Sequence, residues 1–124
     1  MKTIRPVELG ALLENDRPVD ILDIRSCSQF EAVHIEGSHW LESRDISPDT
    51  ILAARELLPP EPLYLVSENG ALARLVAFSL ECQGLSNIVV LTGGISGWQR
   101  HSLPVVGKAT RRAPQILPQI LHAY

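Results

Sequence analysis

Two cysteines and four histidines are the side chains of this chain best suited to nucleophilic or metal chemistry, and their spacing restricts what they can do. Cys27 and Cys82 lie too far apart in the sequence for a C-x-x-C redox pair or a metal-binding motif. His34 and His39 lack a credible third ligand, so we expect no metal site. Free cysteines commonly act as small apolar side chains. We expect Cys27 to be an ordinary thiol at a helix start and Cys82 to pack from within a helix.

Ser67 is a candidate nucleophile, because it directly follows a short apolar stretch at 63–66 that predicts a strand. A catalytic serine needs an adjacent base and an orienting group. The chain has no G-x-S-x-G motif, and no Ser-His-Asp order can be defended. We therefore expect Ser67 to cap the helix that follows it.

The turn Ser67-Glu68-Asn69-Gly70 precedes a predicted helix over 71–83. Backbone N–H groups at such a helix start can form a nest that attracts anions. Glu68 carries its own negative charge next to this nest. We expect the Glu68 carboxylate to fill the nest from within, which would exclude a bound anion.

Alternating helix and strand patterns must position these residues. Apolar runs predict strands at 19–24, 38–41, 63–66 and 88–91. Between and after them, helices are expected at 6–15, from Ser26 to about His34, at 49–58, at 71–83, and after Thr92-Gly93-Gly94. Strands separated by helices predict an α/β fold with a parallel sheet between two helical layers. Ligands bind such sheets beyond the carboxyl ends of the strands, here the loops after Asp23, Val66 and Leu91.

The size and composition fit a globular protein. The chain has 124 residues, of which 45% are hydrophobic and 20% charged, so we expect a single domain. No window approaches about 18 uninterrupted apolar residues, which argues against a membrane span. The first residues lack the apolar stretch of a signal peptide, so we expect a cytoplasmic protein. We also expect it to have no cofactor.

Charge is unevenly distributed along the chain. The net charge is −3, but all fourteen acidic residues precede residue 99. The body lacks a basic stripe, and Trp40 and Tyr64 are too scattered for a base-stacking platform, so we expect no nucleic-acid binding. The basic segment 99–124 is either a solvated end or an interaction tail.

The last residues carry a short repeat, Pro-Gln-Ile-Leu, at 114–117 and 118–121. The repeat places Ile116, Leu117, Ile120 and Leu121 at helical spacing, which predicts a short amphipathic helix. Such a helix is too short to be stable alone. We therefore divide the chain into a domain over 1–107 and a tail over 108–124. The tail packs on the body, binds a partner or a second copy in a homodimer, or does not pack.

Three segments together suggest a family. Asp23-Ile24-Arg25, followed by Phe30-Glu31-Ala32-Val33-His34-Ile35-Glu36-Gly37, resembles the D-x-R…H-I-P-G-A signature of rhodanese-like domains. The segment 80–89 resembles the helix and last strand of that family, and Leu91-Thr92-Gly93-Gly94-Ile95-Ser96-Gly97-Trp98 with Leu103-Pro104-Val105 resembles its ending. The resemblance covers about residues 3–106 and implies a three-layer domain with about five parallel strands.

The resemblance also implies an active-site loop, whose chemistry this sequence lacks. Active members transfer a sulfane sulfur on a cysteine, within a loop C-R-x-G-x-R after the fourth strand. Here that loop is Ser67-Glu68-Asn69-Gly70-Ala71-Leu72. A serine hydroxyl cannot form a stable persulfide as a thiolate does. Glu68 repels an anionic donor by about 1 kcal/mol, and Leu72 offers no guanidinium fork. We expect no sulfurtransferase activity and a protein-interaction or regulatory role.

Two other functions remain open. Cys27 is the one thiol near the expected active face, so a displaced sulfur carrier is one alternative, and a small-anion sensor using the 67–72 loop is the other. The remaining motif residues match structural positions of the family. By this resemblance Asp23 and Arg25 form an ion pair, His34 satisfies backbone groups, and Glu36 replaces the usual proline. The other structural motif residues are Gly37, Gly93, Gly94 and the core aromatic Trp98.

Overall fold

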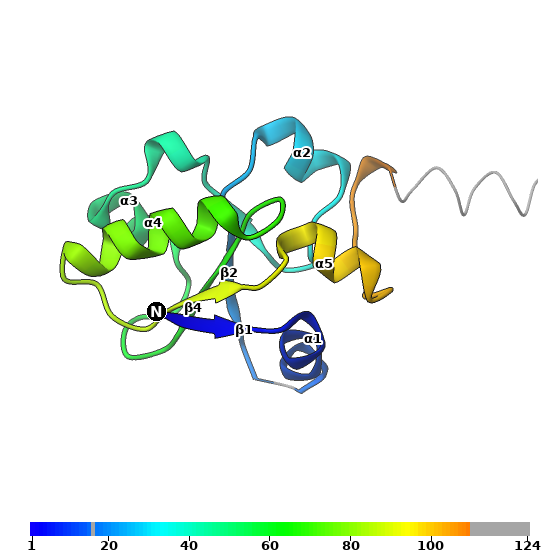
Figure 1. Cartoon of the computed structure of the whole chain (residues 1–124), viewed down its shortest axis with the longest axis horizontal. Coiled ribbons are helices and arrows are strands. Elements are labelled where there is room, and N and C mark those ends of the chain that lie inside the picture. The colour runs from blue at the N-terminus through cyan, green and yellow to red at the C-terminus, as the bar shows by residue number, and fades with distance from the viewer. Residues whose placement is uncertain (16, 110–124) are drawn as a thin grey trace, which may run out of the picture.

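Five short strands form one parallel sheet in the computed structural model, which describes residues 1–15 and 17–109. The strands are β1 (Lys2–Ile4), β2 (Asp20–Asp23), β3 (His39–Trp40), β4 (Leu63–Val66) and β5 (Ile88–Leu91). The helices are α1 (Pro6–Glu14), α2 (Cys27–Ala32), α3 (Pro48–Ala54), α4 (Ala71–Cys82) and α5 (Gly94–Arg100), with a 3₁₀ turn at Ser43–Asp45. The sheet order is β1-β5-β4-β2-β3 (Figure 1), which confirms the predicted α/β fold.

Each face of the sheet is covered by its own pair of helices. Successive strand residues point to opposite faces, so Leu65 faces α3 and α4 whereas Tyr64 and Val66 face α1 and α5. All four residues of β2, β4 and β5 are buried, as expected for parallel strands covered on both sides. One hydrophobic core therefore lies on each face of the sheet. Because the strands are parallel, their carboxyl ends lie at the same edge of the sheet.

Trp98 anchors the segment that follows α5. Its ring is fully buried, and its indole Nε1 donates a hydrogen bond of 2.9 Å to the carbonyl of Pro104. Two residues later, Val106 pairs with His34 through two backbone hydrogen bonds of 2.8 and 2.9 Å. The chain after α5 is therefore tied to the end of α2.

Several details of the fold differ from the sequence expectations, and β1 is a strand that the sequence patterns did not predict. The helix expected at 49–58 ends at Ala54, because Asp20 accepts hydrogen bonds from the N–H groups of Glu56 and Leu57 and draws this segment toward β2. Cys82, expected to pack, is exposed, as is Cys27. The predictions for 114–121 lie outside the described residues. Within the described part of the chain, no helix is long and apolar enough to cross a membrane.

The start of α5 presses directly on the β4–α4 loop. The N–H groups of Ile95 and Ser96 donate to the carbonyls of Ser67 and Glu68 at 2.9 and 3.0 Å. Gly94 adopts a φ of +57°, and a Cβ built there would lie 2.3 Å from the Ser67 carbonyl oxygen. Only glycine fits this contact, because the opposing atoms are backbone. The predicted turn at Thr92-Gly93-Gly94 is thus what brings two of the three candidate loops together.

We predict that Gly94→Ala destabilises the protein about 1–3 kcal/mol more than Gly84→Ala. Gly84, which ends α4 with a φ of +94°, is the matched control, because a Cβ there meets nothing within 4 Å. Urea denaturation of both variants measures the difference. Equal losses would show that the left-handed conformation alone, and not the contact with Ser67, requires glycine at residue 94.

Candidate functional site

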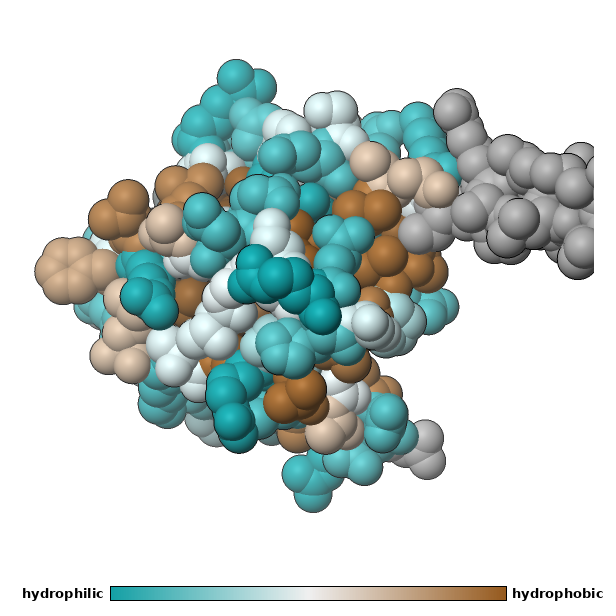
Figure 2. All heavy atoms as spheres, turned by 45° about the vertical axis from the view of Figure 1, so that its right-hand side comes forward, coloured by the Kyte–Doolittle hydropathy of each residue, from teal (hydrophilic) through white to brown (hydrophobic). Residues whose placement is uncertain are grey.

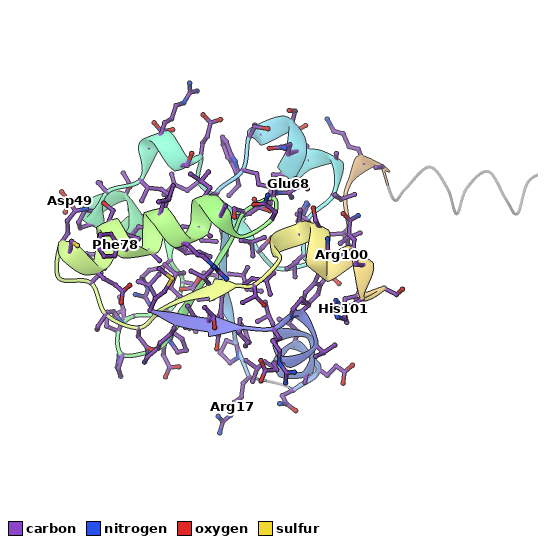
Figure 3. The ribbon with its side chains drawn as sticks, viewed as in Figure 1. Arg17, Asp49, Glu68, Phe78, Arg100 and His101 are labelled. Carbon is purple, nitrogen blue, oxygen red and sulfur yellow. The ribbon has the colours of Figure 1, made fainter. Side chains whose placement is uncertain are left out.

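The loops after β2, β4 and β5 meet at the carboxyl edge of the sheet. An open pocket of about 310 Å³ lies there, lined by residues of α2 and of the start of α4. Figure 3 labels one of its lining residues, Glu68, on the loop before α4. Its polar lining side chains include those of Arg25, Ser26, Gln29, Glu42, Ser67, Glu68 and Asn69, and Leu72 adds an apolar wall. The loops predicted to carry a ligand site are therefore adjacent in space.

Ser67 serves as the internal acceptor for the start of α4. Its side chain is buried, and only 1% of the residue is exposed. The hydroxyl oxygen accepts hydrogen bonds from the N–H groups of Gly70 at 3.1 Å and Ala73 at 3.2 Å. Asn69 adds a third, from the N–H of Ala71 to its Oδ1 at 3.1 Å. The loop satisfies its own helix start, which is the capping role predicted for Ser67.

Glu68 does not fill the nest of loop N–H groups, so that expectation is wrong. Its Oε2 accepts a hydrogen bond of 2.8 Å from the Ser96 hydroxyl, and its Oε1 lies 3.5 Å from the Arg25 guanidinium. Gln29 donates a longer bond of 3.5 Å to the same oxygen. The carboxylate turns toward α2 and α5 because Ser67 and Asn69 already cap α4. Figure 3 labels Glu68 at this position, where the residue is half-exposed.

The sequence analysis did not predict that Glu68 would bind Ser96 and Gln29. Gln29 has a visible role in the Ser26 capping box, where its Oε1 accepts from the Ser26 N–H at 3.1 Å. Nothing in the local pattern shows that its amide also reaches a loop 39 positions away. Ser96 lies in the first turn of α5, and only the fold places this turn beside Glu68.

Asp23 and Arg25 form a buried, two-pronged ion pair behind the pocket. Arg25 Nε lies 3.0 Å from Asp23 Oδ1, and Arg25 Nη2 lies 2.8 Å from Oδ2. The same Nη2 donates to the carbonyl of Val33 at 2.6 Å, which ties β2 to the end of α2. Asp23 thus neutralises Arg25, and Glu68 leaves this group of three charges with a net charge of −1. The pocket therefore has the wrong sign for an oxyanion.

Cys27 is exposed, and its surroundings disfavour the thiolate. Its Sγ donates a hydrogen bond of 3.2 Å to Glu31, whose carboxylate also pairs with Lys108 at 2.6 Å. The hydrogen bond to Glu31 raises the pKa of the thiol, and desolvation and the charges of Glu31 and Glu42 act in the same direction. A reactive cysteine needs the opposite environment.

The histidines have structural contacts of their own. His34 Nδ1 lies 2.7 Å from the Phe30 carbonyl, and its ring stacks on Phe30 with centroids 3.9 Å apart. His39 pairs with Glu56 at 2.9 Å. Within residues 1–15 and 17–109, no three histidine, cysteine or carboxylate side chains gather where they could hold a metal ion.

Comparison with known proteins gives one consistent family. The model of the Rhodanese-like domain family matches residues 5–101. A curated relative, the "Probable adenylyltransferase/sulfurtransferase MoeZ" of Mycobacterium tuberculosis, is 28% identical over 102 residues, which are 82% of this chain. The match covers only 26% of that relative's length.

Solved structures agree. The rhodanese-like domain of the Anabaena protein Alr3790 superposes with a TM-score of 0.78 at 22% identity, over 92% of this chain and 85% of that one. A rhodanese-like domain protein from Staphylococcus aureus is 28% identical, with a TM-score of 0.69, over 79% of this chain and 91% of its own. The likeness thus spans almost the whole described domain.

We predict that Ser67→Ala lowers the free energy of unfolding by about 1–3 kcal/mol, because two buried N–H groups lose their acceptor. Ser79→Ala, on the exposed side of the same helix, should change it by no more than about 0.5 kcal/mol. Urea denaturation measures both. A neutral Ser67→Ala would contradict the capping role.

We predict that Glu31→Gln accelerates alkylation of Cys27 severalfold at pH 8, in a Cys82→Ser background. The substitution replaces a charged acceptor with a neutral amide, which weakens the hydrogen bond and removes the negative charge that raise the pKa of the thiol, so the pH–rate curve should move to lower pH. Iodoacetamide labelling followed by mass spectrometry measures the rate. Glu56→Gln, which removes a carboxylate paired with His39 instead, is the control and should leave the rate unchanged.

Proposed function

Because this chain belongs to the rhodanese-like domain family, we propose that it is a member that does not transfer sulfur and acts as a protein-binding module. The observation that carries this proposal is the Ser67 hydroxyl, which sits buried at the centre of the β4–α4 loop and accepts hydrogen bonds from Gly70 and Ala73. In this proposal Ser67 occupies the position at which active relatives hold the sulfur-carrying cysteine.

The neighbouring side chains support the absence of sulfur transfer. Glu68 and Leu72 stand at the loop positions where active relatives carry arginines, so the loop lacks cations that would bind thiosulfate. Arg25, whose guanidinium lies 3.5 Å from the Glu68 carboxylate, is already paired with Asp23. A hydroxyl with no base beside it remains protonated near neutral pH and is a poor nucleophile.

The two alternatives have weaker support. A displaced sulfur carrier would use Cys27, but its hydrogen bond to Glu31 raises the pKa of the thiol. A small-anion sensor would use the loop N–H groups, but those of Gly70, Ala71 and Ala73 already have acceptors within the loop. The relatives named as sulfurtransferases favour the first alternative only by family membership.

The surface around the pocket suggests the chemistry of the partner. Glu68 supplies negative charge at the pocket, Glu42 at its rim pairs with Arg44, and Leu72 exposes an apolar side chain. A protein segment that carries a basic side chain next to apolar ones complements this arrangement. Binding there would engage the same edge of the sheet that active relatives use for chemistry.

We predict that the full chain, incubated with thiosulfate and cyanide, produces no more thiocyanate than its Cys27→Ser/Cys82→Ser variant. Ser67→Cys alone should restore little activity, because Glu68 and Leu72 remain. The triple variant Ser67→Cys/Glu68→Arg/Leu72→Arg should exceed the single variant at least tenfold, because it restores both the thiol and the cations that stabilise its thiolate.

Intact mass after thiosulfate treatment provides the second measurement. The unmodified sequence should gain no sulfur. Turnover that disappears on Cys27→Ser, or a persulfide on Cys27, would establish the displaced-thiol alternative. Equal activity of the single and triple variants would show that the charges at residues 68 and 72 matter little.

A further inference from the structure

Helix α4 has an apolar outer side in addition to its buried one. Ala73, Ala77 and Leu80 are buried against the sheet. On the opposite side, Leu75 and Phe78 are 70% and 63% exposed. Figure 3 labels Phe78 on this helix, and Figure 2 shows apolar side chains protruding on the side of the molecule where α3 and α4 lie. A helix that is apolar on both sides normally has a second neighbour.

Exposed residues at heptad spacing form one stripe along this outer side. Ala71, Leu75, Phe78 and Cys82 follow one another in steps of four, three and four residues, and all four are exposed. Residues at these steps lie one above another on a helix. We call these four residues the α4 stripe. The same spacing is typical of helices that pack side by side against each other.

Two opposite charges lie on the same flank of the α4 stripe. Arg74 and Glu81 are seven residues apart, which is almost two helical turns and about 10 Å, so they do not reach each other. Both side chains are exposed, and neither forms an ion pair within the described part of the chain. A flank with a cation near one end and an anion near the other is complementary to an antiparallel copy of itself.

We propose that this chain forms a homodimer in which the α4 stripes of two copies pack antiparallel. The two-fold axis passes between Leu75 and Phe78, so Leu75 of one copy contacts Phe78 of the second copy. Arg74 then lies opposite Glu81 of the second copy, and symmetry repeats this pair. The apolar side chains lose their exposure, and both charges gain a partner. The contact does not depend on whether the domain transfers sulfur.

The charges select the antiparallel direction over the parallel one. In a parallel helix pair, a residue on this flank faces the position five residues later in the second copy. Arg74 would then face Ser79 and Glu81 would face Ser86, so neither charge would gain an opposite charge. The direction also decides where the thiols lie. In the antiparallel pair, Cys82 faces Ala71 of the second copy, and the two Cys82 residues are about 16 Å apart along the helix axis.

The helix pair is short, so we expect weak association. Helix α4 has twelve residues, which corresponds to a length of about 18 Å. Interfaces that bury less than about 1,200 Å² are typical of transient complexes, and a dissociation constant on the order of 100 µM corresponds to such a contact. Leu72 lies on the other flank of the stripe, where it faces Ser79 of the second copy. Because Leu72 also lines the pocket, the second copy reaches the apolar wall of the pocket.

Reversal of the flanking charges tests the proposal. Sedimentation equilibrium of the full chain under reducing conditions, from about 10 µM to about 1 mM, measures the dimer. We predict that Arg74→Glu and Glu81→Arg each weaken it about fivefold or more, because each places like charges opposite one another twice. The Arg74→Glu/Glu81→Arg double variant should regain the original affinity to within about twofold, since it restores two attractive pairs.

Two further samples complete this measurement. An equal mixture of the Arg74→Glu and Glu81→Arg variants should form a heterodimer, because each supplies the charge that the other needs. Arg17→Glu changes the net charge by the same amount as Arg74→Glu and should have no effect. Figure 3 labels Arg17 well away from Phe78, beyond the end of α1.

The apolar part of the contact is tested separately. Leu75→Ser/Phe78→Ser should abolish the dimer and leave a cooperative urea transition, because both side chains are exposed. Val7→Ser removes an exposed apolar side chain from α1 and should leave the dimer unchanged.

Cross-linking reports the direction of the helices independently. In a Cys27→Ser background, a short bismaleimide should link two Ala71→Cys chains, because residue 71 of one copy faces Cys82 of the second copy. Chains with Cys82 alone should not be linked through this contact. The Ala71→Cys/Cys82→Ser variant should not be linked either, since each residue lies about 16 Å from its own symmetry mate along the axis.

Three results would overturn the proposal. A monomer at every concentration would show that the α4 stripe does not bind a second copy. A dimer that survives Leu75→Ser/Phe78→Ser would assign the association to another surface. Charge reversals without effect, or linkage through Cys82 alone, would exclude the antiparallel arrangement. None of these measurements involves thiocyanate production, so failure here is distinguishable from failure of the proposed function.

Discussion

Helix α4 begins inside the protein, and this location requires an acceptor that the chain itself supplies. Two N–H groups at its start are directed at one buried atom, the Ser67 hydroxyl oxygen. Water cannot replace that acceptor without opening the loop, because Ser67 is buried and its carbonyl receives the N–H of Ile95. The atom at the centre of the loop is therefore held by the fold whether or not it carries out chemistry. A loop of this shape can persist after its reactivity is lost, since a hydroxyl and a sulfur both accept hydrogen bonds from N–H groups.

The charge beside the β4–α4 loop is set by Asp23, Arg25 and Glu68. Arg25 is needed to hold β2 and the end of α2, and Asp23 neutralises it in a buried pair. Removing one member of such a pair is costly, so the guanidinium is committed to structure. Glu68 then adds a negative charge that its hydroxyl, amide and guanidinium neighbours stabilise in place. Asp23, Arg25 and Glu68 together place a net negative charge at this edge of the sheet, which supports the proposal of a basic partner.

Much of the fold could be predicted because strand and helix signals in this chain are strong. Runs such as Ile88-Val89-Val90-Leu91 are apolar without interruption, and the structure buries them on both faces. The site was less predictable, since Glu68 has partners on α2 and α5 that only the three-dimensional arrangement brings together. The helix expected through Leu58 failed for a similar reason, because a distant carboxylate, Asp20, takes the N–H groups of Glu56 and Leu57. Local patterns carry no information about such long-range acceptors.

Helix α4 packs against the sheet with one face and exposes the other to the surface. Its small buried residues, Ala73 and Ala77, let it lie close to the sheet, whereas the large apolar side chains of Leu72, Leu75 and Phe78 are exposed. At the start of the helix, the N–H groups of Gly70, Ala71 and Ala73 already have acceptors in Ser67 and Asn69. What remains available is the outer surface, where Leu72 adjoins the carboxylates of the pocket.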